Sequence, residues 1–286
     1  MGAPGDSVLR AITNDGAFRV VVAETTRTVR DAVAAQHATP ATARQFGDLL
    51  TGAVLFRETM APSLRVQTVL RGVGGRGSLV ADSHPSGMTR GLIQLPEGSD
   101  SVDTGAGALL QLMRTLPRGR INQGVVEIPE GGDVSHAMMA YMQTSEQVVS
   151  MVAVATLLEA GEVRAAGGYL VQLLPEVGRG PLLVMTERLR DFENIESHVL
   201  DAEFSPSWLL EQLLHGMEYT ELERSQIGFD CWCDELRLLS VLSTVDRADL
   251  EDLLAQGEPL EITCDYCRKE YRIAPAKLRG LMGQSS

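Results

Sequence analysis

The chain carries Cys231-Trp232-Cys233 and Cys264-Asp265-Tyr266-Cys267, and these two stretches decide how its last part folds. They contain all four cysteines of the 286 residues. Four thiolates in two close pairs are typical of a tetrahedral zinc site, so Cys231, Cys233, Cys264 and Cys267 are the predicted metal ligands. A zinc-bound thiolate is also the form of cysteine that an oxidant attacks. The pattern therefore indicates a metal site, redox chemistry, or both.

Residues 228–286 have few bulky apolar side chains for a module of their length. Chains this short rarely hold a core without a metal or disulfides, so the module is predicted to fold around zinc. Loss of that metal would remove on the order of 10 kcal/mol of folding free energy. The same pairs could instead close as two disulfides, Cys231–Cys233 and Cys264–Cys267. Spacing alone leaves a purely structural zinc site and a redox site both open.

Composition narrows the class of protein. The formal net charge is −13, and residues 228–286 alone carry eleven acidic and seven basic residues. Because nucleic-acid binding needs clustered Lys and Arg, we expect no nucleic-acid partner. No apolar run approaches the roughly 18 residues of a membrane span, and the N-terminus lacks a signal-peptide pattern. We expect a cytoplasmic protein with no membrane partner, and spaced cysteine pairs in that compartment usually mean metal or redox chemistry.

Residues 1–178 are predicted to form a mixed α+β domain. An Asn14-Asp15-Gly16 turn lies between two β-prone runs, which indicates a hairpin over 8–22. A helix is expected over 26–37, and another from Thr39 toward Met60, with Pro40 at its first position. Further strands are expected, and their ranges are 64–70, 78–82, 89–95, 125–128 and 167–174. The pattern over 137–158 is helical, and this mixed order of elements favours α+β architecture over a doubly wound sheet.

Residues 179–227 are predicted to be a helical, metastable linker between this domain and the cysteine module. They carry ten acidic and four basic residues, and the stretch Val177-Gly178-Arg179-Gly180-Pro181 marks the boundary at which they begin. One helix begins at Ser205-Pro206 and carries an apolar stripe. Because Gly216 lies within the stripe and glycine destabilises a helix, this helix is expected to be marginal alone and to need docking on another surface. The stripe consists of Leu209, Leu210, Leu213, Leu214 and Met217.

Other motifs carry no function. Residues 72–77, Gly-Val-Gly-Gly-Arg-Gly, match the dinucleotide pattern G-x-G-x-x-G, but a strand follows where that fold needs a helix. We interpret them as a hairpin loop and expect no nucleotide cofactor. The five histidines are scattered, and no catalytic constellation exists apart from the thiols. The protein is therefore predicted not to be an enzyme.

The cysteine module resembles that of the thirty-three-kilodalton heat-shock chaperone family, which is a redox-regulated bacterial holdase. The similar segments are 229–233, 262–267 and Tyr271-Arg272-Ile273. Upstream, Ser145-Glu146-Gln147, the Gly167-Gly168 strand, Thr39-Pro40 and residues 87–91 are also similar to the family. The resemblance covers nearly the whole chain in order.

This resemblance implies a mechanism. Reduced protein would hold one Zn²⁺ per chain at the four cysteines and be inactive. Peroxide with mild unfolding, or hypochlorous acid, would form the disulfides Cys231–Cys233 and Cys264–Cys267 and release zinc. The 179–227 linker would then unfold, and the protein, a homodimer when oxidised, would bind unfolding clients without ATP. Our hypothesis is that the Leu209–Met217 stripe docks on the N-terminal domain in the reduced state.

Alternatives remain at this point. Asp234 and Glu235 follow the second cysteine where the family often has Ser and then Glu-Arg, and their charge is expected to raise the thiol pKa values. The chain could then be a constitutive chaperone with structural zinc. It could also be a thiol-disulfide oxidoreductase that uses Cys264–Cys267, although such a motif normally opens a helix in a β-α-β unit. A zinc-ribbon nucleic-acid binder is disfavoured by charge.

Overall fold

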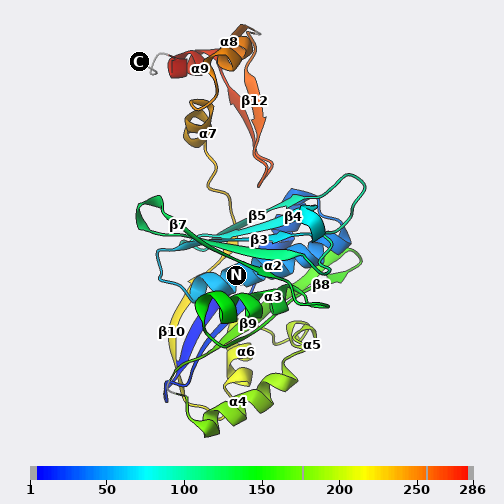
Figure 1. Ribbon diagram of the computed structural model, residues 1–286, viewed down its shortest axis with the longest axis vertical. Coiled ribbons are helices and arrows are strands. Elements are labelled where there is room, and N and C mark those ends of the chain that lie inside the picture. The colour runs from blue at the N-terminus through cyan, green and yellow to red at the C-terminus, as the bar shows by residue number, and fades with distance from the viewer. Residues whose placement is uncertain (1–4, 176, 256, 283–286) are drawn as a thin grey trace. The chain divides into compact units, whose positions relative to one another are not determined.

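The computed structural model describes residues 5–175, 177–255 and 257–282. The chain divides into two compact units, the first ending at Phe229 and the second beginning at Asp230 (Figure 1). Residues 179–227 belong to the first unit, and their separate behaviour as a linker stays a prediction. None of the helices described has both the length and the apolar character needed to cross a membrane.

The first unit contains a five-stranded sheet with the order β10-β1-β2-β9-β8. Neighbouring strands in it are antiparallel, and the predicted hairpin over 8–22 is its β1–β2 pair, with Gly16 in the left-handed region at φ 71°. The strands are β1 (Ser7–Thr13), β2 (Phe18–Glu24), β8 (Ser150–Glu159), β9 (Glu162–Leu173) and β10 (Tyr219–Gln226).

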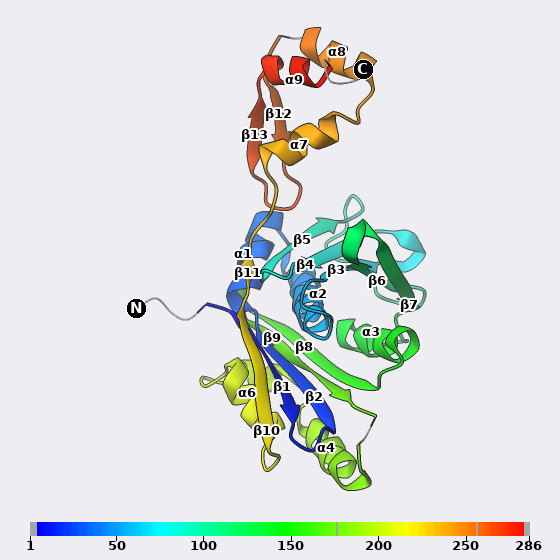
Figure 2. The ribbon, with the colours of Figure 1, turned by 90° about the vertical axis from the view of Figure 1, so that its left-hand side faces the viewer.

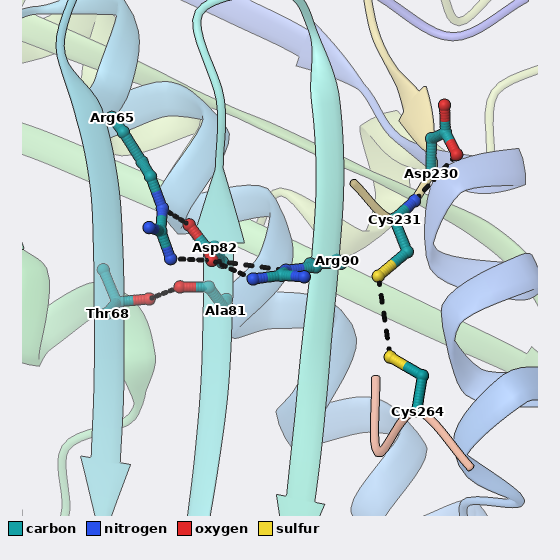
Figure 3. A network of polar contacts seen from close by, with 8 residues as sticks. All are labelled: Arg65, Thr68, Ala81, Asp82, Arg90, Asp230, Cys231 and Cys264. Carbon is teal, nitrogen blue, oxygen red and sulfur yellow. Dashed lines mark hydrogen bonds and ion pairs between the residues drawn. The ribbon is translucent and has the colours of Figure 1, made fainter. Parts of the chain in front are cut away.

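A six-stranded sheet has the order β11-β5-β4-β3-β6-β7. Its strands are β3 (Arg65–Arg71), β4 (Ser78–Ser83), β5 (Met88–Gln94), β6 (Leu109–Thr115), β7 (Ile121–Glu127) and β11 (Gly228–Phe229). The glycine-rich residues 72–77 join β3 to β4 and contain the short 3-10 turn Val73–Gly75, so the prediction of a hairpin loop is confirmed. On this sheet the fully buried Asp82 binds Arg65 Nε at 2.6 Å and Arg90 Nε at 3.4 Å, which ties β3, β4 and β5 together (Figure 3).

Helices fill the space between the two sheets (Figure 2). They are α1 (Thr26–Gln36), α2 (Pro40–Glu58) and α3 (Val134–Tyr141). Thr39 caps α2 by accepting the Thr42 N–H, as the Thr-Pro signal predicts. At Gly47 any Cβ would lie 2.3 Å from Thr156 Oγ1, so glycine lets α2 pack closely on β8. Most residues of α2 are buried, and this helix is the centre of the larger core.

The opposite face of the five-stranded sheet is covered by α4 (Arg179–Asp191), α5 (Glu196–Val199) and α6 (Pro206–Leu213) (Figure 1). Ser205 caps α6 by accepting the Trp208 N–H at 3.2 Å. The helical pattern predicted for 179–227 is correct up to Leu213 but wrong for 219–226, which form strand β10. This segment pairs along its length with β1, and backbone pairing with an existing strand outweighs its weak helical preference.

The helix predicted over 137–158 was also wrong in its second half. The helical part continues from α3 through a π-helical turn, Met142–Glu146, and ends at Gln147, which is left-handed at φ 57°. Strand β8 follows. Its centre holds Val152, Val154 and Thr156, and β-branched side chains lose χ1 freedom in a helix but pack well in a sheet.

The second unit is small. Its elements are α7 (Glu235–Leu242), α8 (Arg247–Ala255), β12 (Leu260–Thr263), β13 (Glu270–Ile273) and α9 (Pro275–Met282). Strands β12 and β13 form an antiparallel hairpin, and α8 precedes it in the chain. Together the two units give the mixed α+β fold with a small four-cysteine module that the sequence predicts.

Candidate metal centre

The first cysteine pair lies in the segment that precedes α7. The backbone N–H of Cys231 donates to Asp230 Oδ1 at 2.7 Å, which fixes the turn on which the first sulfur sits (Figure 3). Just after Cys233, Asp234 caps α7 by accepting the Arg237 N–H at 2.8 Å. A side-chain cap on each side of the pair therefore holds this short Cys-x-Cys segment in place.

The second pair lies on the turn that joins β12 to β13. The N–H of Cys264 donates to the Lys269 carbonyl at 2.9 Å, and the Arg268 N–H donates to the Cys264 carbonyl at 2.8 Å. Arg268 is left-handed at φ 60°, a conformation that tightens the turn directly after Cys267. This tight turn places both thiols of the Cys-x-x-Cys motif on one side of the hairpin.

The four sulfurs meet at one point. Their Sγ atoms all lie within 4.8 Å of one another. Cys231 Sγ is 3.9 Å from Cys264 Sγ, and Cys233 Sγ is 3.4 Å from Cys267 Sγ. Four thiolates that bind zinc at about 2.3 Å in a tetrahedron lie about 3.8 Å apart. The sulfur spacing and the all-thiolate donor set therefore fit a zinc ion without rearrangement of the backbone.

Tyr271 on β13 also contacts the site, and the sequence analysis gave it no role there. Its hydroxyl lies 3.1 Å from Cys233 Sγ and 2.9 Å from the Cys233 carbonyl, and it donates to this cysteine. The ring is only 9% exposed and belongs to the core of the second unit. Alternate residues of strand β13 face the core, and Tyr271 is one of them. This alternation is the sequence signal that could have identified it.

Hydrogen bonds and burial shift the pKa values of two of the thiols in opposite directions. Burial acts to raise the pKa of Cys233, but hydrogen bonds from Tyr271 and from the other three thiols outweigh it and lower the pKa. Burial is the main cause that raises the pKa of Cys267, and hydrogen bonds with Cys233 and Cys264 raise it further. Cys233 is thus the better thiolate of the two, and Cys267 is the thiol that donates to it.

The two acids beside the first pair, which were predicted to raise the thiol pKa values, each form an ion pair with a cation. Asp234 Oδ2 lies 3.5 Å from Arg237 Nε, and Glu235 forms an ion pair with Lys277. Their charge is therefore balanced locally, and neither carboxylate is among the main causes of the shifts at Cys233 and Cys267.

The apolar core behind the sulfurs is small. The buried residues of its cluster are Tyr271, Ile273 and Leu278, and Cys233 and Cys264 pack against them. The Cys-x-x-Cys motif lies on a hairpin turn and does not open a helix, which distinguishes it from thioredoxin-like redox enzymes. Among the residues described, these four cysteines are the group whose ligand atoms come close enough to hold a metal.

The family model described as "Hsp33 protein" matches residues 6–274. The chain belongs to the Hsp33 family. Similar curated proteins named 33 kDa chaperonin come from Desulforamulus reducens, 28% identical over 97% of each chain, and from Thermus thermophilus, 28% identical over 97% of this chain and 86% of the other. The fold matches the crystal structure of the Thermotoga maritima 33 kDa chaperonin with a TM-score of 0.82, at 21% identity over 98% of both chains.

Membership of the Hsp33 family supports a chaperone role for the chain. The family also binds zinc in general, and the four clustered cysteines are the residues that could hold the ion here. The resemblance given by the cysteine module and the upstream segments is therefore confirmed.

The predicted stripe at α6 belongs to the first unit, whereas the cysteines belong to the second. Leu209, Leu210, Leu213 and Leu214 are at most 1% exposed, and Met217 is partly buried against the same cluster. They pack on the face of β1 and β2 in this Hsp33 protein. Residues of α4 and α5 extend the same cover, and Tyr169 of β9 fixes it by donating its hydroxyl to the Phe192 carbonyl at 3.2 Å.

Proposed function

We propose that this protein is a redox-regulated holdase, an ATP-independent chaperone that binds unfolding proteins and prevents their aggregation under oxidative stress. The observation that carries the proposal is the cluster of four thiols within 4.8 Å in a unit with a small apolar core. Such a unit depends on its sulfur cross-links, so a change in thiol chemistry becomes a change in folding.

In the reduced, inactive form, Cys231, Cys233, Cys264 and Cys267 hold one Zn²⁺. The ion, when bound, supplies a cross-link among four thiolates that is worth on the order of 10 kcal/mol to the fold. Tyr271 keeps Cys233 oriented toward the other sulfurs through its hydroxyl. Because the metal holds the sulfurs as thiolates, they stay in the form that reacts with oxidants.

Oxidation would act on the two cysteine pairs, Cys231–Cys233 and Cys264–Cys267. For each pair, two thiolates would lose two electrons and form one S–S bond, the O–O bond of one peroxide molecule would break, and two protons from solvent would complete two molecules of water. Sulfurs joined in this way no longer bind metal, so zinc leaves and residues 230–286 lose their main cross-link. All four sulfurs are mutually close, so the pairing rests on the family resemblance and is checked by peptide mapping.

Activation then requires that residues 179–227 leave the first unit. Their helices cover an apolar face of the five-stranded sheet that includes Leu9, Val20, Val22 and Val171. Release of the docking stripe, Leu209 to Met217, would expose this face to clients. Large exposed apolar surfaces bind other apolar surfaces, including those of unfolding proteins. We also propose that the protein is cytoplasmic, forms a homodimer when oxidised, and has neither nucleic-acid nor membrane partners.

Light scattering from a thermally unfolding client tests the proposal. The protein is added either reduced and zinc-loaded, or peroxide-treated with zinc removed. We expect suppression of scattering only by the oxidised wild-type protein. Equal suppression by both wild-type forms would indicate a constitutive chaperone with structural zinc, and suppression by neither would contradict a holdase.

Hydrogen exchange tests the linker step separately. Amides of residues 205–220 are expected to be protected in the reduced protein and to exchange much faster after oxidation. Comparable protection in the two forms would contradict release of the docking stripe.

A further inference from the structure

Strand β10 is the last strand of the segment 179–227, and it lies at one end of the five-stranded sheet. It pairs antiparallel with β1 from Ser7↔Gln226 to Thr13↔Tyr219. Its side chains are mostly exposed, and Tyr219 and Ser225 are the half-buried ones among them. Backbone hydrogen bonds, which any sequence can make, therefore hold β10 in place more than side-chain packing does.

The backbone N–H and C=O groups of β1 point alternately toward β10 and toward β2. At the ends of the strand, the Asp6 carbonyl accepts from the Ile227 N–H at 3.1 Å, and the Asn14 N–H donates to the Glu218 carbonyl at 2.9 Å. Because successive residues of a strand point to opposite neighbours, Val8, Arg10 and Ile12 direct their N–H and C=O groups to β10. The odd residues between them face β2, which stays in the sheet.

The β1–β10 pair has a built-in irregularity. Its register shifts between Arg10 and Ala11, so that Arg10 lies opposite Glu223 and Ala11 lies opposite Glu221. Leu222 falls between these partners as the extra residue, and its side chain is 53% exposed. A bulge leaves a residue unpaired and disrupts the ladder locally, so β10 is a weaker neighbour for β1 than β2 is.

One charged contact links β10 to the interior. Arg10 forms an ion pair with Glu223 and lies 3.3 Å, through Nε, from Glu58 Oε2. Glu58 also pairs with the buried Arg57. When Glu223 is absent, two arginines share one carboxylate at this position. Burial, and then the nearby charge of Arg10, lower the pKa of Arg57 to about 10, and the charge of Glu223 opposes this shift.

We infer that, once β10 has left, the edge of β1 binds an extended segment of the unfolding client as a new antiparallel strand, with a carboxylate of the client opposite Arg10. This inference rests on the proposed function and assigns it a client surface. Strand addition suits a holdase, because main-chain hydrogen bonds give affinity without demanding one sequence. The charge requirement at Arg10 is the selective part, and the apolar face beside β1, uncovered with α6, accepts the client's apolar side chains.

Amide exchange of β1, followed residue by residue by NMR on the full-length protein, tests the inference with an internal control. In the oxidised protein without client, the amides of Val8, Arg10 and Ile12 are expected to exchange at least tenfold faster than in the reduced protein. With a bound client they should regain protection. The amides of Leu9 and Ala11 bond to β2 and should stay protected throughout.

The possible failures are distinguishable when client retention is measured in the same samples. A client that is retained while Val8, Arg10 and Ile12 stay unprotected overturns the inference and leaves the holdase function intact. A client that is not retained at all contradicts the function itself. Protection that returns without client and rises with protein concentration would assign the edge to a second copy, which also overturns the inference.

A pair of peptides tests the charge requirement without any change to the protein. One carries residues 218–227 of this chain, and the other differs only by Glu223→Lys. The oxidised protein is expected to bind the first about tenfold more tightly, because the lysine peptide places a third cation beside Arg10 and Arg57. Equal affinity of the two peptides would overturn the pairing with Arg10. A scrambled peptide of the same composition controls for non-specific binding.

Discussion

The two compact units of this Hsp33 protein reach stability by different physical routes. The first surrounds α2 with two sheets and buries large clusters of leucine, valine and phenylalanine. The buried cluster of the second consists of Tyr271, Ile273 and Leu278, against which two of its cysteines pack. The fraction of surface buried on folding rises with the size of a unit. The larger unit therefore buries enough apolar surface to fold without a cross-link, whereas the smaller one needs a cross-link. The difference makes thiol chemistry a selective means of unfolding one part of the molecule.

Metal removal should give the largest contrast between the units. A chelator added under reducing conditions should unfold residues 230–286, with a loss on the order of 10 kcal/mol of folding free energy, and leave the β1–β2 and β8–β9 pairs intact. Two-dimensional NMR would show collapse of the signals of Ile262 and Ile273 while those of Val21 and Leu170 keep their dispersion. If both sets persist, the second unit is stable without a metal and the comparison fails.

Leucine truncations separate the two clusters of the first unit. Leu50 of α2 and Leu210 of α6 are both at most 1% exposed, and each change to alanine should cost about 2–5 kcal/mol. Leu50→Ala should lower the melting temperature of the whole unit. Leu210→Ala should mainly loosen residues 179–227 and make the reduced, zinc-loaded protein a partial holdase. Identical behaviour of the two variants in melting and in client scattering would contradict a separable linker.

The pH response should come from the first unit. Burial raises the pKa of Asp48 to about 8, and Asp48 Oδ1 has no hydrogen-bond partner among the residues described. The folded state therefore holds a proton that the unfolded state has lost above about pH 4, so stability falls as pH rises toward 8. Between pH 6 and 7.5 the loss should be about 2 kcal/mol.

Thermal melts at pH 6 and pH 7.5 measure this effect. Asp48→Asn should flatten the pH dependence, whereas Asp31→Asn at an exposed site should leave it unchanged. A dependence that survives in Asp48→Asn would assign the titration to another group.

The smallest effect is expected at Tyr271. Tyr271→Phe keeps the ring in the core but removes the hydroxyl hydrogen bonds to Cys233, at a cost of about 1 kcal/mol. Zinc transfer to a colorimetric chelator should become several-fold faster, and peroxide should release the metal sooner. Tyr266→Phe on the turn between Cys264 and Cys267 is the matched control. Unchanged release rates in Tyr271→Phe would make the contact a packing feature only.

The sequence was sufficient for the features that depend on local chemistry. Cysteine spacing predicted the metal cluster, Thr39-Pro40 predicted the start of α2, and Asn14-Asp15-Gly16 predicted the first hairpin. The last two signals act within a few residues of the elements they predict, and each cysteine pair is itself a local motif. The α+β class followed from the same kind of local pattern.

Features that depend on distant partners were missed. Strand β10 has no apolar alternation of its own, and its conformation is set by pairing with β1, more than 200 residues earlier. The valines of β8 were assigned to the preceding helix because the left-handed residue that ends it, Gln147, is not a usual breaker. The contact of Tyr271 with Cys233 spans 38 residues and depends on the register of the β12–β13 hairpin.

The position of β10 also has a mechanical consequence. The chain leaves this strand at Gln226, makes the two-residue parallel pairing of β11 with β5, and passes into the cysteine unit. A pull transmitted from residue 230 would first break β11 and then reach the Ser7↔Gln226 end of the β1–β10 ladder. A force applied at one end of an antiparallel pair loads its hydrogen bonds one after another, in the unzipping geometry. It does not load all of them at once, as the shear geometry does. Strand β10 is therefore expected to separate from β1 in steps, with a pause at the Leu222 bulge. The length of β1 that becomes exposed then depends on how many of these steps have occurred.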